Sequence, residues 1–454
     1  MKIINPATEE VIADIQADDK ASVETKYKML LSGQKSWAKR SVSDRLNIIF
    51  KFGELVEENA DELAEILSSE TGKPVAQAKG EVMGSLNRIA HLKVNAEKWL
   101  APETILSEGG MEESIHYEAL GVIANISAWN FPYNVGYNVF LYALVSGNAV
   151  LYKPSEFASL TGLKFQELLW KAGVPEDVFQ AVIGAGDIGQ ALLELPLNGY
   201  FFTGSYRTGK YIAEQLAGKL VPVQLELGGK DPLYVMDDVE DVQSAAANAA
   251  EGAFYNNGQS CCAVERIYVH EKIYDEFLPA LTNAVKGFKV GDPTADDTFL
   301  GAITREPQLS VLEGQVKDAT SKGAKLETGG SRIDGKGYFF EPTVLSNVNH
   351  DMEVMKEESF GPIIGVQKVS SDEEALELMQ DTDYGLTAAV FSSDKDRADK
   401  LFQELNTGTV YFNCCDRVSP HVPWSGRKQS GLGYTLSYMG LRAFTQPKAY
   451  HIKG

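Results

Sequence analysis

The chain carries a thiol and a carboxylate whose surroundings suit covalent catalysis. Cys261 stands in Asn256-Asn257-Gly258-Gln259-Ser260-Cys261-Cys262, thirty-five positions after Glu226, which is followed by Leu227-Gly228-Gly229. A thiol is intrinsically nucleophilic, and a carboxylate can take up its proton or activate water. The pair therefore predicts a nucleophile and a general base. The competing interpretations are a buried apolar cysteine and a glutamate that caps a turn.

Three further segments follow consecutive predicted strands and suit a dinucleotide. Gly184-Ala185-Gly186-Asp187-Ile188-Gly189 matches GxGxxG between a strand and a helix. The acidic residue expected about 20 positions later is absent. Lys153 and Glu156 follow residues 149–152 and suit ribose hydroxyls, and Ser205 opens a helix whose amides suit a pyrophosphate. Individually these features also fit a solvated charge pair and a helix cap; together they predict a dinucleotide site.

Alternating strands and helices must position these residues. We predict strands at residues 121–126, 149–152, 178–183 and 199–202, alternating with helices near residues 160–172, 187–193 and 206–216. A second alternating run follows residue 228, with strands at 232–235, 266–269, 363–366 and 387–391 and helices at 239–254 and 273–288. The pattern predicts an α/β fold with a parallel, doubly wound, Rossmann-like sheet and a second parallel-type sheet. The stretch 290–345 is interpreted as insertion-rich turns. Residues 20–70 are predicted to form amphipathic helices, one of them capped at Ser43-Asp44, that end at Thr71-Gly72-Lys73-Pro74.

Composition narrows the class of partner. The 454-residue chain has 63 acidic and 42 basic residues and a net charge of -21. Nucleic acids and anionic membranes are bound by clusters of Lys and Arg, so neither is an expected partner. No apolar run reaches about 18 residues, so no integral membrane segment is expected.

The cysteines indicate a reducing compartment. All four stand in two adjacent pairs, Cys261-Cys262 and Cys414-Cys415. Such pairs do not form the disulfide framework of a secreted domain, and the N-terminus lacks the apolar segment of a signal peptide. We therefore expect a cytoplasmic protein with free thiols. No CxxC spacing is present and there are only six histidines, so no metal site is expected.

Six motifs in register resemble one family over essentially the whole chain. They are Ala128-Trp129-Asn130-Phe131-Pro132, Lys153-Pro154-Ser155-Glu156, Phe202-Thr203-Gly204-Ser205, Leu225-Glu226-Leu227-Gly228-Gly229-Lys230, Gly258-Gln259-Ser260-Cys261 and Glu358-Ser359-Phe360-Gly361-Pro362. On these residues the chain resembles the NAD(P)-dependent aldehyde dehydrogenase superfamily. Two departures are Ala128, where many members have Pro, and Trp424-Ser425 in place of a Phe-Gly-Gly segment.

The resemblance implies a role for each candidate site residue. Cys261 would be the nucleophile, Glu226 the general base and Asn130 the oxyanion donor. Lys153 and Glu156 would hold the adenine-side ribose. The rest of the implied cofactor site comprises Trp129, Ser155, Gly186, Ser205 at the pyrophosphate, Leu227, and Glu358 and Phe360 at the nicotinamide ribose and ring.

The substrate channel is predicted to be aromatic and uncharged. Its expected lining residues are Tyr133, Tyr137, Tyr255, Cys262 and Trp424. Members that oxidise succinate semialdehyde carry arginines in the matching stretches, whereas residues 133–139 and 253–256 contain none. We therefore expect oxidation of an apolar aliphatic or aromatic aldehyde to its acid. The alternatives are a semialdehyde dehydrogenase, a thiol-dependent ester hydrolase and a non-catalytic protein on the same fold.

Cofactor preference and assembly complete the expectations. Glu156 should repel a 2′-phosphate, which favours NAD, although Lys153 and Arg207 leave room for NADP. The resemblance implies a cofactor domain at 1–97 and 119–227, a catalytic domain at 228–430, and an oligomerisation element at 98–118 and 431–454. A homodimer or homotetramer is expected.

Overall fold

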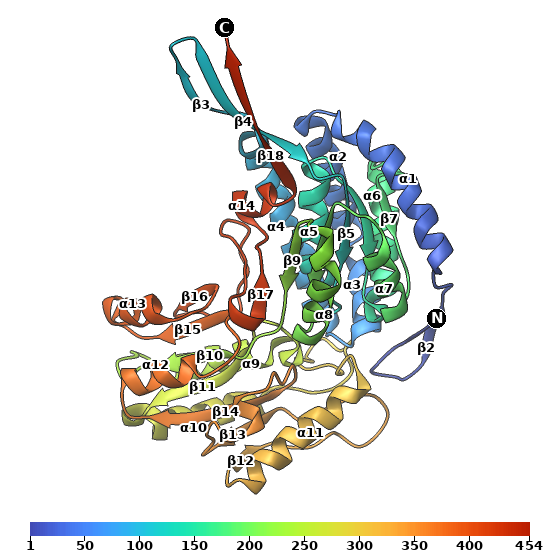
Figure 1. Ribbon diagram of the computed structural model, residues 1–454. Helices are drawn as coiled ribbons and strands as arrows, with labels where there is room; N and C mark the ends of the chain where they lie inside the picture. The colour runs from blue at the N-terminus through green and yellow to red at the C-terminus, as the bar shows by residue number, and fades with distance from the viewer.

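The computed structural model describes residues 1–454 and confirms the predicted α/β architecture (Figure 1). Two large sheets, one of six strands and one of seven, form the body, and a three-stranded sheet projects from it. A short N-terminal hairpin pairs β1 (Lys2–Ile4) with β2 (Val11–Asp14). None of the helices combines the length and apolar character that a membrane span requires.

The six-stranded sheet carries the predicted dinucleotide motifs. Its order is β17-β9-β8-β5-β6-β7, with β5 to β9 parallel and β17 antiparallel to β9. The strands are β5 (Val122–Ile126), β6 (Ala149–Lys153), β7 (Phe179–Ala181), β8 (Gly199–Thr203), β9 (Val223–Glu226) and β17 (Gly431–Leu432). Four helices precede these strands in the chain: α1 (Lys20–Ala38), α2 (Val42–Glu58), α3 (Ala60–Thr71) and α4 (Val75–Leu100). Four more alternate with them: α5 (Pro132–Val145), α6 (Ser159–Ala172), α7 (Gly186–Glu194) and α8 (Tyr206–Leu216).

The seven-stranded sheet positions the nucleophile. Its order is β12-β13-β14-β11-β10-β15-β16, and only the β12–β13 pair is antiparallel. The strands are β10 (Asp231–Val235), β11 (Val264–His270), β12 (Lys325–Thr328), β13 (Thr343–Ser346), β14 (Ile363–Val369), β15 (Thr387–Phe391) and β16 (Thr409–Phe412). Its helices are α9 (Val242–Phe254), α10 (Glu271–Lys286), α11 (Glu306–Ser321), α12 (Asp372–Gln380) and α13 (Lys395–Glu404).

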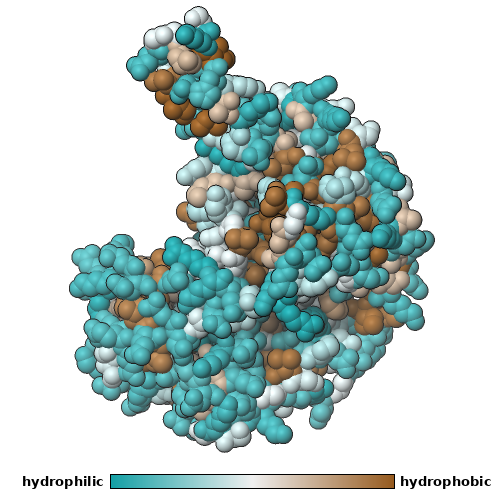
Figure 2. Space-filling model, viewed as in Figure 1, coloured by the Kyte–Doolittle hydropathy of each residue, from teal (hydrophilic) through white to brown (hydrophobic).

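The three-stranded sheet extends from the body as a narrow arm (Figure 1). It consists of β3 (Glu103–Glu108), β4 (Met111–Ala119) and β18 (Thr445–Lys453), with β4 in the centre. The segment 431–454, expected as one element, is divided in the structure: β17 joins the six-stranded sheet, α14 (Ser437–Arg442) follows, and only β18 joins the arm. Figure 2 shows apolar residues on this arm, whereas the lower body is mostly hydrophilic on the same face.

Two local predictions need correction. The stretch 290–345, interpreted as turns, contains α11, whose buried Leu309, Leu312, Val316 and Ala319 recur at helical spacing. Helix α2 is capped by Ser41, which accepts from the backbone N–H of Asp44, two positions before the predicted start. The predicted break after α3 is confirmed, because Gly72 ends that helix with φ of 78°.

Candidate active site

The predicted nucleophile, base and oxyanion donor form a wall between two cavities. Cys261, Glu226 and Asn130 all line a cleft of about 870 Å³, and all three also line a cavity of about 1020 Å³. The cleft contains the segment that follows β8 and the cavity contains residues from α4 and α5. The three side chains therefore face one compartment that contains predicted cofactor residues and another that does not.

A strained turn presents Cys261. Asn256 and Asn257 have φ of 53° and 58°, a left-handed conformation that asparagine tolerates better than most residues. The Asn257 side chain donates to the carbonyls of Gly301 and Ala302, both at 3.2 Å, which stabilises the turn. Cys261 is half-buried and free. The run of residues before Cys261 is thus a fixed turn that holds the thiol at the edge of both cavities.

A buried ion pair positions Asn130. Lys73 pairs with Glu81, both side chains being 1% exposed, and its Nζ also donates to the Asn130 carbonyl at 2.8 Å. The Asn130 Nδ2 donates to the Gln259 carbonyl at 3.1 Å, so one N–H of this amide is used and the second is free for an oxyanion. Sequence reasoning treated Lys73 only as part of a helix break. Its contacts with Glu81 of α4 and with Asn130, which precedes α5, arise only from the tertiary packing.

Glu226, the last residue of β9, is a buried carboxylate that accepts hydrogen bonds from two side chains. It is 5% exposed, and its Oε1 accepts from Gln224 Nε2 at 2.9 Å and from the Thr435 hydroxyl. Burial raises the pKa of Glu226 to about 7, although the Thr435 and Gln224 hydrogen bonds act in the opposite direction. A carboxyl with a pKa near neutrality can accept a proton from water and return it within one turnover.

The second thiol of the pair differs from the first. Cys262 Sγ donates to Asp416 Oδ1 at 3.0 Å, and Ser260 Oγ donates to the same oxygen at 3.0 Å. The neighbouring Cys261 thiol and burial raise the pKa of Cys262 well above its ordinary value. Cys262 is therefore held as a neutral thiol that fixes the loop. Cys414 and Cys415 line a separate hollow that does not include Cys261.

The cleft brings together five of the predicted cofactor residues: Trp129, Ser205, Leu227, Glu358 and Phe360. The rings of Trp129 and Phe360 meet edge to face at 5.6 Å. Glu358 Oε1 accepts from the Gly229 backbone N–H at 3.1 Å, and burial raises the pKa of Glu358 to about 8. A Cβ at Gly228 would lie 2.3 Å from the Glu358 carboxylate, so a side chain at this position would displace that carboxylate.

The other four predicted cofactor residues lie outside the lining of this cleft, at neighbouring strand ends. Lys153 ends β6, Ser155 and Glu156 follow it, and Gly186 begins α7. Lys153 is 5% exposed, yet its Nζ donates only to the Pro154 carbonyl at 3.3 Å and forms no ion pair. A buried ammonium with spare donors, near the Glu156 carboxylate, fits ribose hydroxyls. The residues present thus fit a dinucleotide.

Sequence reasoning missed part of the cleft. Arg305 and Gln308, at the start of α11, also line it, and the Arg305 guanidinium lies 5.7 Å from the centre of the Phe157 ring. Both were hidden in the stretch interpreted as turns. The available signal was the helical spacing of apolar residues after Pro307.

The substrate-side cavity includes three of the five predicted lining residues, Tyr255, Cys262 and Trp424. Tyr133 and Tyr137 are wrong as lining residues, since both are 0% exposed and pack with Phe165 in the core. Residues of a helix point in directions about 100° apart per position. The opposite face of α5 lines the cavity instead, through Asn134, Val135 and Asn138.

Helix α4 forms another side of this cavity. Gly80, Gly84, Asn87 and Arg88 all line it. A Cβ at Gly80 or Gly84 would meet no atom within 4 Å, so the two glycines leave open space. The cavity is therefore wide at α4 and polar along both helices.

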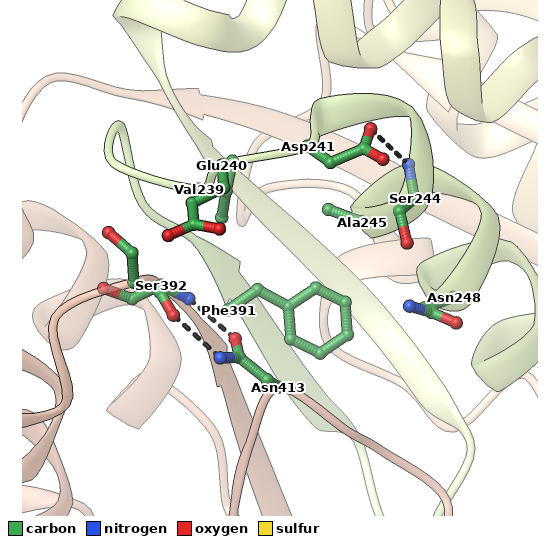
Figure 3. A pocket seen from close by; sticks show the side chains of 10 residues that line it. Val239, Glu240, Asp241, Ser244, Ala245, Asn248, Phe391, Ser392 and Asn413 are labelled. Carbon is green, nitrogen blue, oxygen red and sulfur yellow. Dashed lines mark hydrogen bonds between the residues drawn. The ribbon is translucent and has the colours of Figure 1, made fainter.

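A different hollow lies between the carboxyl ends of β15 and β16 and the start of α9 (Figure 3). Its polar groups are engaged with one another: Asp241 accepts from the Ser244 backbone N–H at 3.0 Å, and Asn413 exchanges two hydrogen bonds with Ser392. It contains no thiol or buried titratable group. The chemistry of the molecule is concentrated at the two cavities that share Cys261.

Comparisons with known proteins identify the family to which this fold and site belong. The Aldehyde dehydrogenase family matches residues 1–450. The chain belongs to this family. A succinate-semialdehyde dehydrogenase [NADP(+)] of Deinococcus radiodurans is 36% identical over 98% of this chain and 93% of its own length.

Solved structures of aldehyde dehydrogenases agree with this fold. A betaine aldehyde dehydrogenase of Staphylococcus aureus in complex with NAD+ has a TM-score of 0.96 at 31% identity, covering 100% of this chain and 92% of its own. A 3,6-anhydro-L-galactose dehydrogenase in complex with NADP has a TM-score of 0.95 at 35% identity, covering 100% and 96%. This aldehyde dehydrogenase is an NAD(P)-dependent oxidoreductase, as the sequence predicted.

Proposed function

We propose that this aldehyde dehydrogenase oxidises its substrate to the free carboxylic acid through a covalent intermediate on Cys261, with Glu226 as the base. The observation that carries the proposal is the shared wall: Cys261, Glu226 and Asn130 face both the cofactor cleft and the substrate-side cavity. A reaction in which an aldehyde loses a hydride to one side and gains water on the same carbon needs this arrangement.

In the first step Cys261 Sγ bonds to the aldehyde carbon. The thiol proton passes to Glu226, and the carbonyl oxygen becomes an alkoxide. The free N–H of Asn130 Nδ2 and the backbone N–H of Cys261 suit this oxyanion, and loss of one such donor typically costs about 10²–10³ in rate. When bound, the nicotinamide ring accepts the hydride from the former aldehyde carbon, which leaves a thioester on Cys261.

In the second step Glu226, having released its proton to solvent, takes a proton from water. The water oxygen adds to the thioester carbon, and the C–S bond breaks while Glu226 returns its proton to sulfur, which frees the acid and the Cys261 thiol. A pKa near 7 lets the same carboxyl serve both proton transfers at neutral pH.

NAD is the proposed preferred cofactor. Glu156, next to the buried Lys153, would accept a hydrogen bond from a ribose 2′-hydroxyl and would repel a 2′-phosphate. The relatives include an enzyme named for NADP and a structure with NAD+, so both cofactors are used among similar proteins.

The apolar substrate expected from the sequence has little support in the cavity. Only seven of its eighteen lining residues are hydrophobic, and Asn87, Asn134 and Asn138 add amide groups. The relatives' names cover both anionic and cationic aldehydes, namely succinate semialdehyde and betaine aldehyde. A polar aldehyde is therefore the proposed substrate.

Assembly and location are proposed from surface features. Ile105 and Ile452 on the arm are 61% and 54% exposed, and the outer edges of β3 and β18 are unpaired. We propose that a second copy covers them in a homodimer or homotetramer, which light scattering would test. The four free cysteines suit the reducing cytoplasm.

The deciding experiment mixes the enzyme with NAD and a panel of aldehydes. Absorbance at 340 nm should rise, and mass spectrometry should find the free acid and an acyl group on Cys261. Cleavage of activated esters without any cofactor-dependent oxidation would instead establish the hydrolase alternative.

A further inference from the structure

Helix α4 places an arginine in the substrate-side cavity, where the sequence predicted none. Arg88 is 4% exposed and lines the cavity that Cys261 lines. Its Nε donates to Asn138 Oδ1 at 2.6 Å, which fixes the plane of the guanidinium. Its terminal nitrogens, Nη1 and Nη2, have no hydrogen-bond partner in the protein, and Arg88 forms no ion pair. Two parallel donors are thus left unsatisfied at the cavity.

Such a group is costly in the free enzyme. Burial disfavours the charged form and lowers the pKa of Arg88, but arginine stays protonated in proteins. A buried charge is normally paired, because desolvation is not otherwise offset. The fork of Arg88 therefore borders the cavity with donors that can bind an anion.

No carboxyl that lines the same cavity forms an ion pair with Arg88, although the charges of Glu81 and Glu226 lie near enough to act on it. Glu81 is committed to Lys73 and to the Tyr133 backbone N–H. Asp416 accepts from Ser260 and Cys262, and burial raises its pKa. Glu226 lies near enough to Arg88 for their charges to interact, but its own pKa is about 7. None of these carboxyls is ion-paired with Arg88, so its terminal nitrogens stay available to an incoming anion.

We propose that Arg88 is a specificity-determining residue that binds a carboxylate at the far end of the substrate, so that this enzyme acts on ω-oxo carboxylic acids. The planar fork of arginine matches a carboxylate with two parallel hydrogen bonds, and Asn138 holds that fork in place. Asn134 on the same face of α5 offers a further amide donor. This inference rests on the proposed oxidation and specifies its substrate class.

From the resemblance to semialdehyde-oxidising members, a carboxylate-binding arginine would be expected shortly after the Trp-Asn-Phe-Pro motif or just before the nucleophile. Arg88 comes from neither stretch. It reaches the same cavity from α4, forty-two positions before Asn130, so a motif-based search of residues 133–139 and 253–256 could not find it.

The test compares 4-oxobutanoate, 5-oxopentanoate and 6-oxohexanoate with butanal, pentanal, hexanal and betaine aldehyde, each with saturating NAD. The best oxo acid should exceed the alkanal of equal carbon number by at least tenfold in kcat/KM, and betaine aldehyde should be poorest. In Arg88→Gln this ratio should fall at least tenfold, mainly through KM, with partial recovery in Arg88→Lys. Lys98→Gln removes an exposed charge from the same helix and should leave the ratio unchanged.

A second variant guards against misfolding of Arg88→Gln. Asn138→Asp would pair the guanidinium internally and should abolish the preference for oxo acids. Equal oxidation of oxo acids and alkanals, or an equal loss for all aldehydes in Arg88→Gln, would overturn the inference while leaving the proposed oxidation intact. Failure to oxidise any aldehyde with NAD or NADP would instead overturn the proposed function, and this inference with it.

Discussion

The two cavities that meet at Cys261 are built in different ways. The cofactor side consists mainly of segments that immediately follow β5, β8 and β9, together with Glu358, Phe360 and the start of α11. The substrate side consists of one face each of α4 and α5, the turn before Cys261, and the segment 416–424. Strand ends in a parallel sheet converge at one edge, whereas helix faces meet only through tertiary packing.

This difference separates the catalytic residues, which are constrained, from the substrate-binding residues, which can vary. The catalytic wall belongs to both sides, so its chemistry is constrained by the cofactor and the substrate together. The helix faces carry no catalytic group and can change the accepted aldehyde without disturbing the wall. Four variants test this division.

The largest effect is expected at the shared wall. Cys261→Ala removes the atom that carries the acyl group, so NADH formation should fall by about 10⁴-fold or more. Calorimetric binding of NAD should remain, because the cofactor cleft is otherwise intact. Cys415→Ala, a free thiol in a separate hollow, is the matched control and should retain activity. Activity above a tenth of the parent in Cys261→Ala would assign the chemistry to another residue.

Glu226→Gln should separate hydride transfer, which forms the thioester, from hydrolysis of the thioester. Without its base, thioester hydrolysis should slow by about 10²–10⁴-fold, and rapid mixing should show a burst of one NADH per Cys261. In the parent enzyme the ionised carboxylate is the base, so kcat should rise with pH through about 7, where Glu226 loses its proton. A flat profile between pH 6 and pH 8, or a burst-free variant, would contradict this role.

A moderate effect is expected on the cofactor side. Glu156→Gln removes the charge that repels a 2′-phosphate, so the ratio of kcat/KM for NADP to that for NAD should rise about tenfold. Glu167→Gln, on the exposed face of α6, changes the net charge equally and should leave the ratio as it is. An unchanged ratio in Glu156→Gln would place the adenine-side ribose elsewhere.

The smallest effect is expected on the core face of α5. The Tyr133 hydroxyl is buried without a hydrogen-bond partner, so Tyr133→Phe should leave stability unchanged or raise it by about 1 kcal/mol. Its kcat/KM should stay within about twofold of the parent, whereas Asn134→Leu on the cavity face should alter substrate preference. A larger kinetic effect for Tyr133→Phe than for Asn134→Leu would reverse the assignment of the two faces. Thermal melts and the aldehyde panel measure both.

The same contrast explains which features the sequence revealed. Cys261, Glu226 and Ser205 stand in local motifs, because backbone geometry at a strand end or turn demands particular neighbours. Arg88 stands in an ordinary helical sequence and Lys73 in an ordinary helix break, and only the tertiary contacts of α4 with α5 and with Asn130 give them a role. Tyr133 and Tyr137 were misplaced for the same reason, since a run of residues after a motif was treated as one surface although a helix has two faces.

The open space beside Gly80 and Gly84 has a consequence for engineering. Each glycine costs a helix interior about 1 kcal/mol relative to alanine, so α4 gives up stability at the two positions where it borders the cavity. A side chain added at either position would both stabilise α4 and narrow the substrate-side cavity. Variants selected for shorter substrates could therefore gain helix stability together with the new activity. Variants selected for bulkier substrates would have to keep both glycines.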